Sequence, residues 1–164
     1  RTACLVTGGF HARGIGELYE PLAEDKGLVL RVEAPAAVPM RGSRELVSQA
    51  LANLVDNAIK YAAPDAAPII GARPGIAIKA TEEGDRILLS VSDGGPGIPE
   101  ADRSRVVERF VRLEQSRSLP GSGLGLSLAQ AVARLHGGEL KLEDNLPGLR
   151  TVMSLPRGGS VQTG

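Results

Sequence analysis

The sequence predicts an α/β (α+β) fold in two layers, with a mixed, mostly antiparallel sheet backed by helices. Apolar residues recur with a helical period over 44–61, and the chain after the glycines at 121–125 is again amphipathic. Apolar runs on either side of short polar turns predict one hairpin over 75–92 and another over 139–155. Of the 164 residues, 42% are apolar, which suffices for one core and favours a single domain.

The N-terminal segment shows the weakest pattern. Residues 1–16 have no period and hold four glycines, so we expect a lead-in of unknown origin before a domain over 17–156. A short helix is predicted over 17–26, broken around Pro21 and ended by Gly27.

The helix over 44–61 carries the strongest signal in the chain. A strand is predicted before it, over 28–33, with a partner expected at 38–41. Ser43 suits the N-cap of the helix, because its hydroxyl can accept a hydrogen bond from a free backbone N–H of the first turn. Asn57 lies at the edge of the broad apolar face, where a polar side chain must find a partner.

The rest of the chain is organised around two glycine clusters. A Pro/Ala/Gly loop over 62–75 leads into the first hairpin, whose second strand ends at the first cluster, DGGPGIP over 93–99. The second cluster begins the second helix, which is predicted to end at His136 before two further glycines. The closing hairpin is followed by a tail expected to be flexible, 157–164.

The balance of charge excludes some classes of protein. Lys and Arg together number 19, as do Asp and Glu, so the formal charge is zero. This argues against nucleic-acid binding and against direct contact with an anionic membrane. The chain has no Trp, two Tyr and two Phe, so it can offer few aromatic rings on which bases could stack.

The composition also limits metal sites and membrane segments. Cys4 is the only cysteine, which excludes an internal disulfide and a cysteine-rich zinc site, and two histidines leave little for a His-based site. The longest uncharged run, 118–133, is too short to cross a bilayer, and no signal peptide is visible. We therefore expect a cytoplasmic domain.

The two glycine clusters flank a segment rich in arginine. Glycines at the start of a helix let backbone N–H groups approach an anion, and the helix adds its positive end. The second cluster is not a P-loop, because no lysine follows it, and it lacks the spacing of a dinucleotide fold. Taken alone, the cluster fits a plain turn at a helix start equally well.

Five arginines lie within the segment 103–117, against two acidic residues, Glu108 and Glu114. Such a segment can be a solvated amphipathic stretch. It can also be a flap that brings guanidinium groups onto a triphosphate, where bidentate contacts are strong, and its position between two glycine clusters favours the flap. The arginines are Arg103, Arg105, Arg109, Arg112 and Arg117.

Four motifs in order resemble a known family. NLVDNAIKY (53–61), DGGPGIP (93–99), ERFVRL (108–113) and GSGLGLSLAQAVARLHGG (121–138) are similar to the N, G1, F and G2 boxes of the ATP-binding catalytic domain of bacterial sensor histidine kinases. The resemblance covers residues 17 to 156 and implies the Bergerat fold of the GHKL superfamily, with ATP and Mg²⁺ as ligands.

The resemblance assigns roles to the polar residues of the first helix. Asn57 matches the asparagine whose amide oxygen binds the Mg²⁺ ion that bridges the phosphates, and such an oxygen is a suitable ligand for that ion. Asn53, one turn earlier, matches a second asparagine near the phosphates. Lys60 is expected to meet phosphate charge, and Tyr61 to lie beside the nucleotide.

In the first glycine cluster, Asp93 matches the aspartate that accepts a hydrogen bond from the adenine amino group and so selects ATP over GTP. Gly95 and Gly97 match glycines that let the backbone pass close to the base, and Ile98 belongs to the same expected pocket.

The F box and the second cluster complete the expected site. Phe110 matches the phenylalanine that packs the flap, and Arg109, Arg112 or Arg117 is expected to reach the γ-phosphate, although the sequence does not say which. The residues expected to hold the phosphates in the second cluster are Gly121, Ser122, Gly123, Leu124 and Gly125.

The chain also departs from the family pattern. Gly94 stands in place of the usual asparagine, Val107 in place of the first phenylalanine of the F box, and the loop over 62–75 is longer than usual. Neither His11 nor His136 has the setting of a phosphoacceptor, so both are expected to be structural or incidental.

These features together suggest a kinase domain without its acceptor. The chain is expected to bind Mg·ATP and to donate the γ-phosphoryl group to a histidine on a dimerisation domain of its parent protein. That parent protein can be an inner-membrane sensor. A response regulator would follow downstream.

Two alternatives stay open. One is an ATPase of the same superfold, which would carry a water-activating glutamate where this chain has Asn53. The other is a degenerate module that binds nucleotide or partners without phosphoryl transfer.

Overall fold

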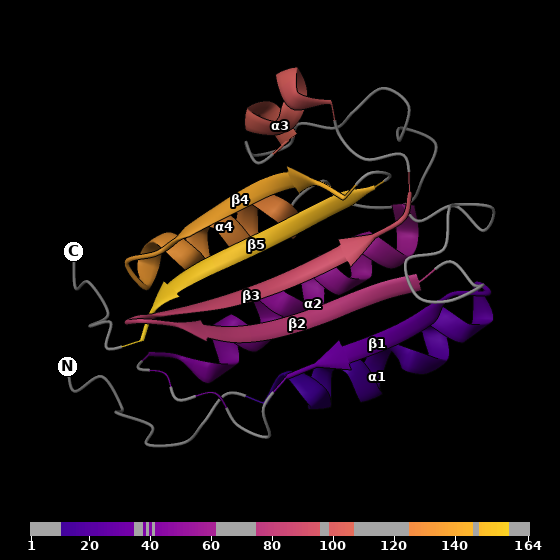
Figure 1. Ribbon diagram of the computed structural model, residues 1–164, viewed down its shortest axis with the longest axis horizontal. Coiled ribbons are helices and arrows are strands. Elements are labelled where there is room, and N and C mark those ends of the chain that lie inside the picture. Colours follow the sequence, from indigo (N-terminus) through magenta and orange to yellow (C-terminus); the bar gives the residue numbers. More distant parts are fainter. Residues whose placement is uncertain are drawn as a thin grey trace.

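The computed structural model describes residues 11–34, 38, 40, 42–61, 75–95, 99–106, 125–145 and 148–157. Within them the chain forms helices on one side of a single sheet (Figure 1). The elements are α1 (Ala12–Asp25), β1 (Val29–Glu33), α2 (Arg44–Tyr61), β2 (Gly75–Glu83), β3 (Arg86–Asp93), α3 (Glu100–Val106), α4 (Gly125–Leu135), β4 (Glu139–Asp144) and β5 (Leu149–Pro156).

The sheet is mixed and mostly antiparallel, as the sequence predicts. Its strand order is β1-β2-β3-β5-β4, in which only β1 and β2 run parallel among the described strands. The two expected hairpins are both present. The first has a tight turn whose Gly84 has a φ of +61°, a left-handed conformation that glycine adopts at little cost.

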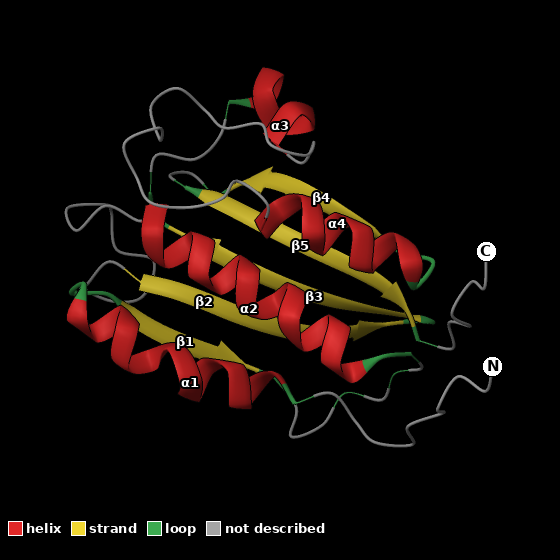
Figure 2. Ribbon diagram, turned by 180° about the vertical axis from the view of Figure 1, so that it is seen from behind, coloured by secondary structure: helices red, strands yellow, loops and turns green. Residues whose placement is uncertain are grey.

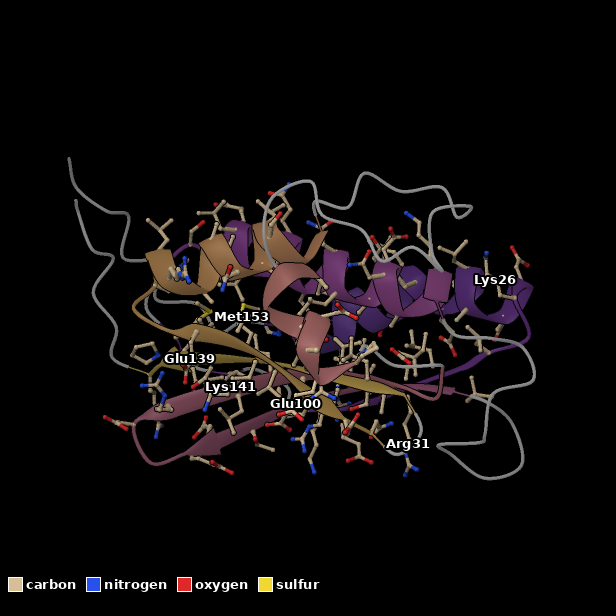
Figure 3. The ribbon with its side chains drawn as sticks, turned by 90° about the horizontal axis from the view of Figure 1, so that it is seen from above. Lys26, Arg31, Glu100, Glu139, Lys141 and Met153 are labelled. Carbon is tan, nitrogen blue, oxygen red and sulfur yellow. The ribbon has the colours of Figure 1, made fainter. Side chains whose placement is uncertain are left out.

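The core lies between the sheet and its helices. Alternate residues of the strands face α1, α2 and α4, which cover the same face of the sheet (Figure 2). Seen from above, the helices form one layer and the strands the other, with Lys26 on the helical side and Arg31 on the opposite side (Figure 3). The largest fully buried side chains of the sheet are Ile76, Ile78, Ile87, Leu89, Met153 and Leu155.

Helix α2 begins where the sequence predicts. The hydroxyl of Ser43 accepts a hydrogen bond from the backbone N–H of Leu46 at 3.2 Å, which confirms Ser43 as the N-cap. The apolar face packs into the core, where Val47, Leu51 and Val55 are fully buried.

The first helix differs from the expectation. It begins at Ala12 rather than at residue 17, so residues 12–16, expected in the lead-in, form its first turns, and Pro21 lies inside it without ending it. Packing outweighs the local signals here. A Cβ on Gly16 would lie 2.3 Å from Cγ2 of Val32, so this glycine brings α1 against β1, while the Arg13 guanidinium donates to the carbonyl of Ala34 at 3.2 Å.

The structure gives β1 a partner that the sequence did not suggest. β1 pairs in parallel with β2, in the register Leu30↔Ile76, while the expected partner at 38–41 lies partly outside the described residues. The alternation of β1 marks it as a strand but holds no information about its neighbour. α2 supplies the crossover that a parallel pair requires.

The segment that follows the first glycine cluster begins with a short helix. α3 covers Glu100–Val106, where the sequence indicated only a polar, arginine-rich stretch. Glu100 and Asp102 lie in its first turn, where negative charge is favourable near the helix N-terminus.

Candidate functional site

A buried histidine joins the end of α4 to the start of α2. His136 is 4% exposed, and its Nε2 accepts a hydrogen bond from the backbone N–H of Ser43 at 3.1 Å. Nδ1 lies 2.8 Å from the carbonyl oxygen of Val132, so Nδ1 carries the proton and donates. Gly42 makes room for the ring, since a Cβ there would lie 2.3 Å from Cδ2 of His136. The expectation of a structural role is confirmed.

This junction sets the position of α4 along α2. The two helices run in opposite directions, and α4 has 11 residues, a length of about 16 Å at the usual rise per residue. Counting the same distance from Ser43 along α2 reaches residues 53–55. By this count we expect the N-terminus of α4 near the turn of α2 that begins at Asn53, and Figure 2 shows the two helices side by side. Positive helix charge would thus lie next to the amides.

Three of the predicted polar residues share one side of α2. Asn53, Asn57 and Lys60 are all half-buried. Lys60 is not isolated: its Nζ lies 2.8 Å from Oδ2 of Asp56, one turn earlier. Tyr61 is the last residue of α2, and its side chain lies outside the description.

Helix α1 adds a residue that the sequence did not suggest. Tyr19 is half-buried, and its pKa is raised, first by burial and then by the negative charge of Asp56, with Lys60 opposing the shift. The phenol therefore lies near the Asp56–Lys60 pair. No motif marks Tyr19, because its neighbours come from a helix distant in sequence.

Asp93 is the last residue of β3 and is 7% exposed. Its Oδ1 accepts hydrogen bonds from the backbone N–H groups of Gly95 at 2.9 Å and of Leu149 at 3.4 Å. Burial raises the pKa of Asp93, and these two bonds oppose the rise. Among the described residues no hydrogen bond reaches the second oxygen, Oδ2, which leaves an acceptor for a ligand.

The turn between β4 and β5 packs against Asp93. The side-chain amide of Asn145 donates to the backbone carbonyl of Asp93 at 2.8 Å. Gly148, with a φ of +109°, approaches so closely that a Cβ would lie 1.9 Å from the same oxygen. The sequence indicates a turn here, but only the adjacency of β3 and β5 brings it to Asp93.

Helix α3 is attached to the same end of the sheet. The guanidinium of Arg103 donates to Oδ1 of Asp144, the last residue of β4, at 2.7 Å. Arg103 therefore has a structural partner. α3 rises beyond the edge strand β4 (Figure 1).

The remaining predicted residues lie outside the described part of the chain. Gly125 is the first residue of α4, and only its place at the helix start is known. The others are Gly97, Ile98, Arg109, Phe110, Arg112, Arg117, Gly121, Ser122, Gly123 and Leu124.

The described residues form no cluster of three or more His, Cys, Asp or Glu side chains that could hold a metal ion. Any divalent ion here would need ligands of another kind, such as an amide oxygen and the ligand's own oxygens. In the same part of the chain no helix is both long and apolar enough to span a membrane.

Comparisons with known proteins agree with this architecture. A signal transduction histidine-protein kinase/phosphatase, MprB, from Mycobacterium sp. (strain KMS) is 45% identical over 102 residues, which cover 62% of this chain and 18% of that protein. MprB from Mycobacterium avium (strain 104) is 41% identical over 109 residues, 66% of this chain and 20% of that protein. The chain thus spans about a fifth of the length of these relatives.

Solved structures of histidine kinases share this fold. A mycobacterial sensor histidine kinase MprB superposes with a TM-score of 0.71 at 27% identity, covering 92% of this chain and 95% of that one. The catalytic domain of the histidine kinase ThkA gives a TM-score of 0.74 at 24% identity, with 89% and 91% covered. Full-length ShkA in complex with AMPPNP gives 0.74 at 23% identity, with 98% and 33% covered.

A family whose description is "Histidine kinase-, DNA gyrase B-, and HSP90-like ATPase" matches residues 42–159, which include α2, β3, α4 and the closing hairpin. Since this match covers more than half of the chain, the protein belongs to the histidine kinase-, DNA gyrase B- and HSP90-like ATPase family.

Proposed function

We propose that this chain binds Mg·ATP and donates the γ-phosphoryl group to a histidine on a dimerisation domain, which these 164 residues do not contain. A response regulator would receive the group afterwards, as in two-component signalling. The observation that carries the proposal is the buried carboxylate of Asp93, whose Oδ1 is occupied by two backbone N–H groups.

This carboxylate suits the recognition of adenine. The exocyclic amino group of adenine is a donor, and Asp93 offers an ionisable acceptor that is largely shielded from water. Guanine carries a carbonyl oxygen at the same position, which a carboxylate would repel. Adenine nucleotides are therefore the ligands that this end of β3 should prefer.

The polar side of α2 suits the phosphates and their metal ion. Mg²⁺ retains several waters and takes few protein ligands, so one amide oxygen from Asn57 together with phosphate oxygens is a fitting set. Asn53 lies one turn earlier, where we expect the N-terminus of α4. Lys60 would contribute positive charge, part of which its ion pair with Asp56 offsets until phosphate competes for the ammonium group.

Phosphoryl transfer needs positioning and neutralisation of charge more than covalent chemistry by the protein. This agrees with a site of amides, a lysine and a helix N-terminus, to which Arg109, Arg112 or Arg117 would add charge at the γ-phosphate. Relatives whose names describe histidine-protein kinases support transfer to histidine rather than to water.

The direct test is phosphoryl transfer from radiolabelled ATP to a separately purified dimerisation domain that carries the acceptor histidine. We expect label on that domain when this chain and Mg²⁺ are both present, and little phosphate release by this chain alone. Fast Mg²⁺-dependent phosphate release without any acceptor would favour an ATPase, against the chemistry of Asn53, whose amide cannot serve as a general base.

The metal ligand can be tested by Asn57→Ala. Nucleotide binding by the wild type should tighten when Mg²⁺ is added, and the variant should lose that increment, measured by calorimetric titration with and without the metal. Gln49→Ala is a matched control, since it removes an exposed amide from the same helix. An Asn57→Ala variant that keeps the full Mg²⁺ effect would contradict the assignment.

A nucleotide-binding module without transfer is the remaining alternative. Gly94 and Val107, which replace the usual residues of the family, are the features that favour it. ATP binding together with failure to label any acceptor domain would support this alternative.

A further inference from the structure

The β4–β5 turn meets Asp93 through three separate contacts. Asn145 donates its side-chain N–H to the carbonyl oxygen of Asp93 at 2.8 Å, and Leu149 donates its backbone N–H to Oδ1 at 3.4 Å. Gly148 lies against the same carbonyl, with no space for a Cβ. The turn therefore contacts both the main chain and the side chain of Asp93.

The two described ends of the turn are bonded to each other. The backbone N–H of Asn145 donates to the carbonyl oxygen of Gly148 at 3.1 Å. Arg103 of α3 bonds Asp144, the residue before Asn145, at 2.7 Å. These two bonds therefore restrain the chain on either side of the Asn145 amide that donates to Asp93.

The bond from Asn145 acts at the point where β3 ends. On its β5 side, β3 ends its pairing at Ser92↔Arg150, so the carbonyl of Asp93 lies beyond that ladder, while Asp93 still pairs with Ile76 of β2. The side-chain amide of Asn145 supplies a donor for this carbonyl, and so joins the residue that bears the carboxylate to the β4–β5 turn.

We infer that Asn145 is a positioning residue for nucleotide selection: by bonding the Asp93 carbonyl, it fixes the direction in which the Asp93 carboxylate meets the purine amino group. The inference rests on the proposed function, because it requires Asp93 to read the base. Asn145 itself does not touch the nucleotide.

The test compares two nucleotides that differ at the position Asp93 reads. ITP carries a carbonyl oxygen where ATP carries the amino group, while the phosphates and the metal site are the same. A merely structural role for Asn145 would weaken ATP and ITP binding equally. A positioning role would lower the affinity for ATP and leave that for ITP nearly unchanged.

We would titrate the purified chain with Mg·ATP and Mg·ITP, in the wild type and in Asn145→Ala. The ratio of ATP affinity to ITP affinity should fall about three- to tenfold in the variant, the range for one lost hydrogen bond. Asn145→Asp is the second variant. It keeps the turn-forming side chain but replaces the donor with a carboxylate, and the same fall is expected.

Ser154→Ala is the matched control. It removes the 2.7 Å hydrogen bond from Arg86 Nε to Ser154 Oγ, on β5 and away from Asp93. The ratio of ATP affinity to ITP affinity in Ser154→Ala should equal that of the wild type. A ratio unchanged in Asn145→Ala and Asn145→Asp would overturn the inference, as would failure of both to fold, because the bond would then serve the fold as a whole.

Failure of the proposed function has a different signature. If wild-type protein bound ATP and ITP equally, Asp93 would not read the base and the proposal itself would fail. A second outcome is that the wild type prefers ATP to ITP, that Asp93→Asn loses this preference and that both Asn145 variants keep it. In that case only the role of Asn145 is rejected.

Discussion

Asp93 combines two requirements that oppose each other. As an acceptor for a base it should be shielded from water, yet burial disfavours its ionised form and raises its pKa. The N–H groups of Gly95 and Leu149 offset part of that cost by bonding Oδ1. The carboxylate that we propose as the adenine acceptor is thus held at some expense of stability, which a neutral substitution can reveal.

This opposition makes a prediction about pH. Below the ordinary pKa of 3.8 Asp93 is protonated in both states, and its contribution to stability is fully present. As pH rises above that value, Asp93 ionises in the unfolded chain before it ionises in the folded one. Stability therefore falls with rising pH, and the fall ends once pH has passed the raised pKa of the folded state. Asp93→Asn keeps an acceptor for both N–H groups and has no such loss.

The measurement is urea unfolding of both proteins across the acid range to neutrality. The stability of Asp93→Asn relative to the wild type should increase as pH rises above about 4 and then level off. Gln49→Ala, which removes an exposed amide of α2 and no titratable group, is the control in the same series. A difference between Asp93→Asn and wild type that stays constant with pH would show that burial does not disfavour the Asp93 carboxylate.

Pairs of elements are joined by polar contacts at their ends as well as by the core. His136 at the end of α4 accepts the Ser43 N–H at the start of α2, and Arg13 of α1 bonds the carbonyl that follows β1. These contacts use backbone groups that helix and strand ends leave without partners. The contact at His136 also sets the end of α4 against the start of α2.

His136→Leu tests this junction. Leucine has a similar size but no acceptor, so the part-buried Ser43 N–H would lose its partner at a cost of about 1–3 kcal/mol in unfolding free energy. His136→Gln should recover part of that loss, since its amide oxygen can accept. Leu135→Ala, at a neighbouring side chain that is 41% exposed, is the control in the same denaturation series. Equal stability of His136→Leu and wild type would show that the bond contributes nothing.

At the scale of the whole molecule, the order of the strands assembles the site. Because β5 lies between β3 and β4, the turn that ends β4 meets the last residue of β3. Because β1 pairs with β2, α1 lies beside α2 and Tyr19 comes near Lys60. Residues from four regions of the sequence therefore gather at one end of the sheet.

A ligand held by several elements should stabilise the molecule as a unit. Mg·ATP at a hundred times its dissociation constant would add about 2.7 kcal/mol to the free energy of unfolding. For a chain of this size we expect a rise in Tm of about 5–10 °C, measured by thermal unfolding monitored by circular dichroism. Mg·GTP at the same concentration should shift Tm much less. No shift with Mg·ATP would contradict binding.

The sequence by itself determined the strands of the two hairpins, the helices that begin at Arg44 and Gly125, the mixed sheet and the family. These features depend on local signals: helical periods, alternating runs, the cap at Ser43, and four motifs whose order is visible without any coordinates. Asn53, Asn57, Lys60 and Asp93 could be predicted as site residues for the same reason. Their roles stay predictions, as do those of the positions in the stretches 96–98 and 107–124.

Only the tertiary structure decided which distant segments meet. The parallel partner of β1, the start of α1 at Ala12 and the contact of Asn145 with Asp93 all depend on strand order and close packing. A strand pattern fixes which face is buried but not which strand lies alongside. Such pairings are chosen by the free energy of the whole core, which no short stretch of sequence contains.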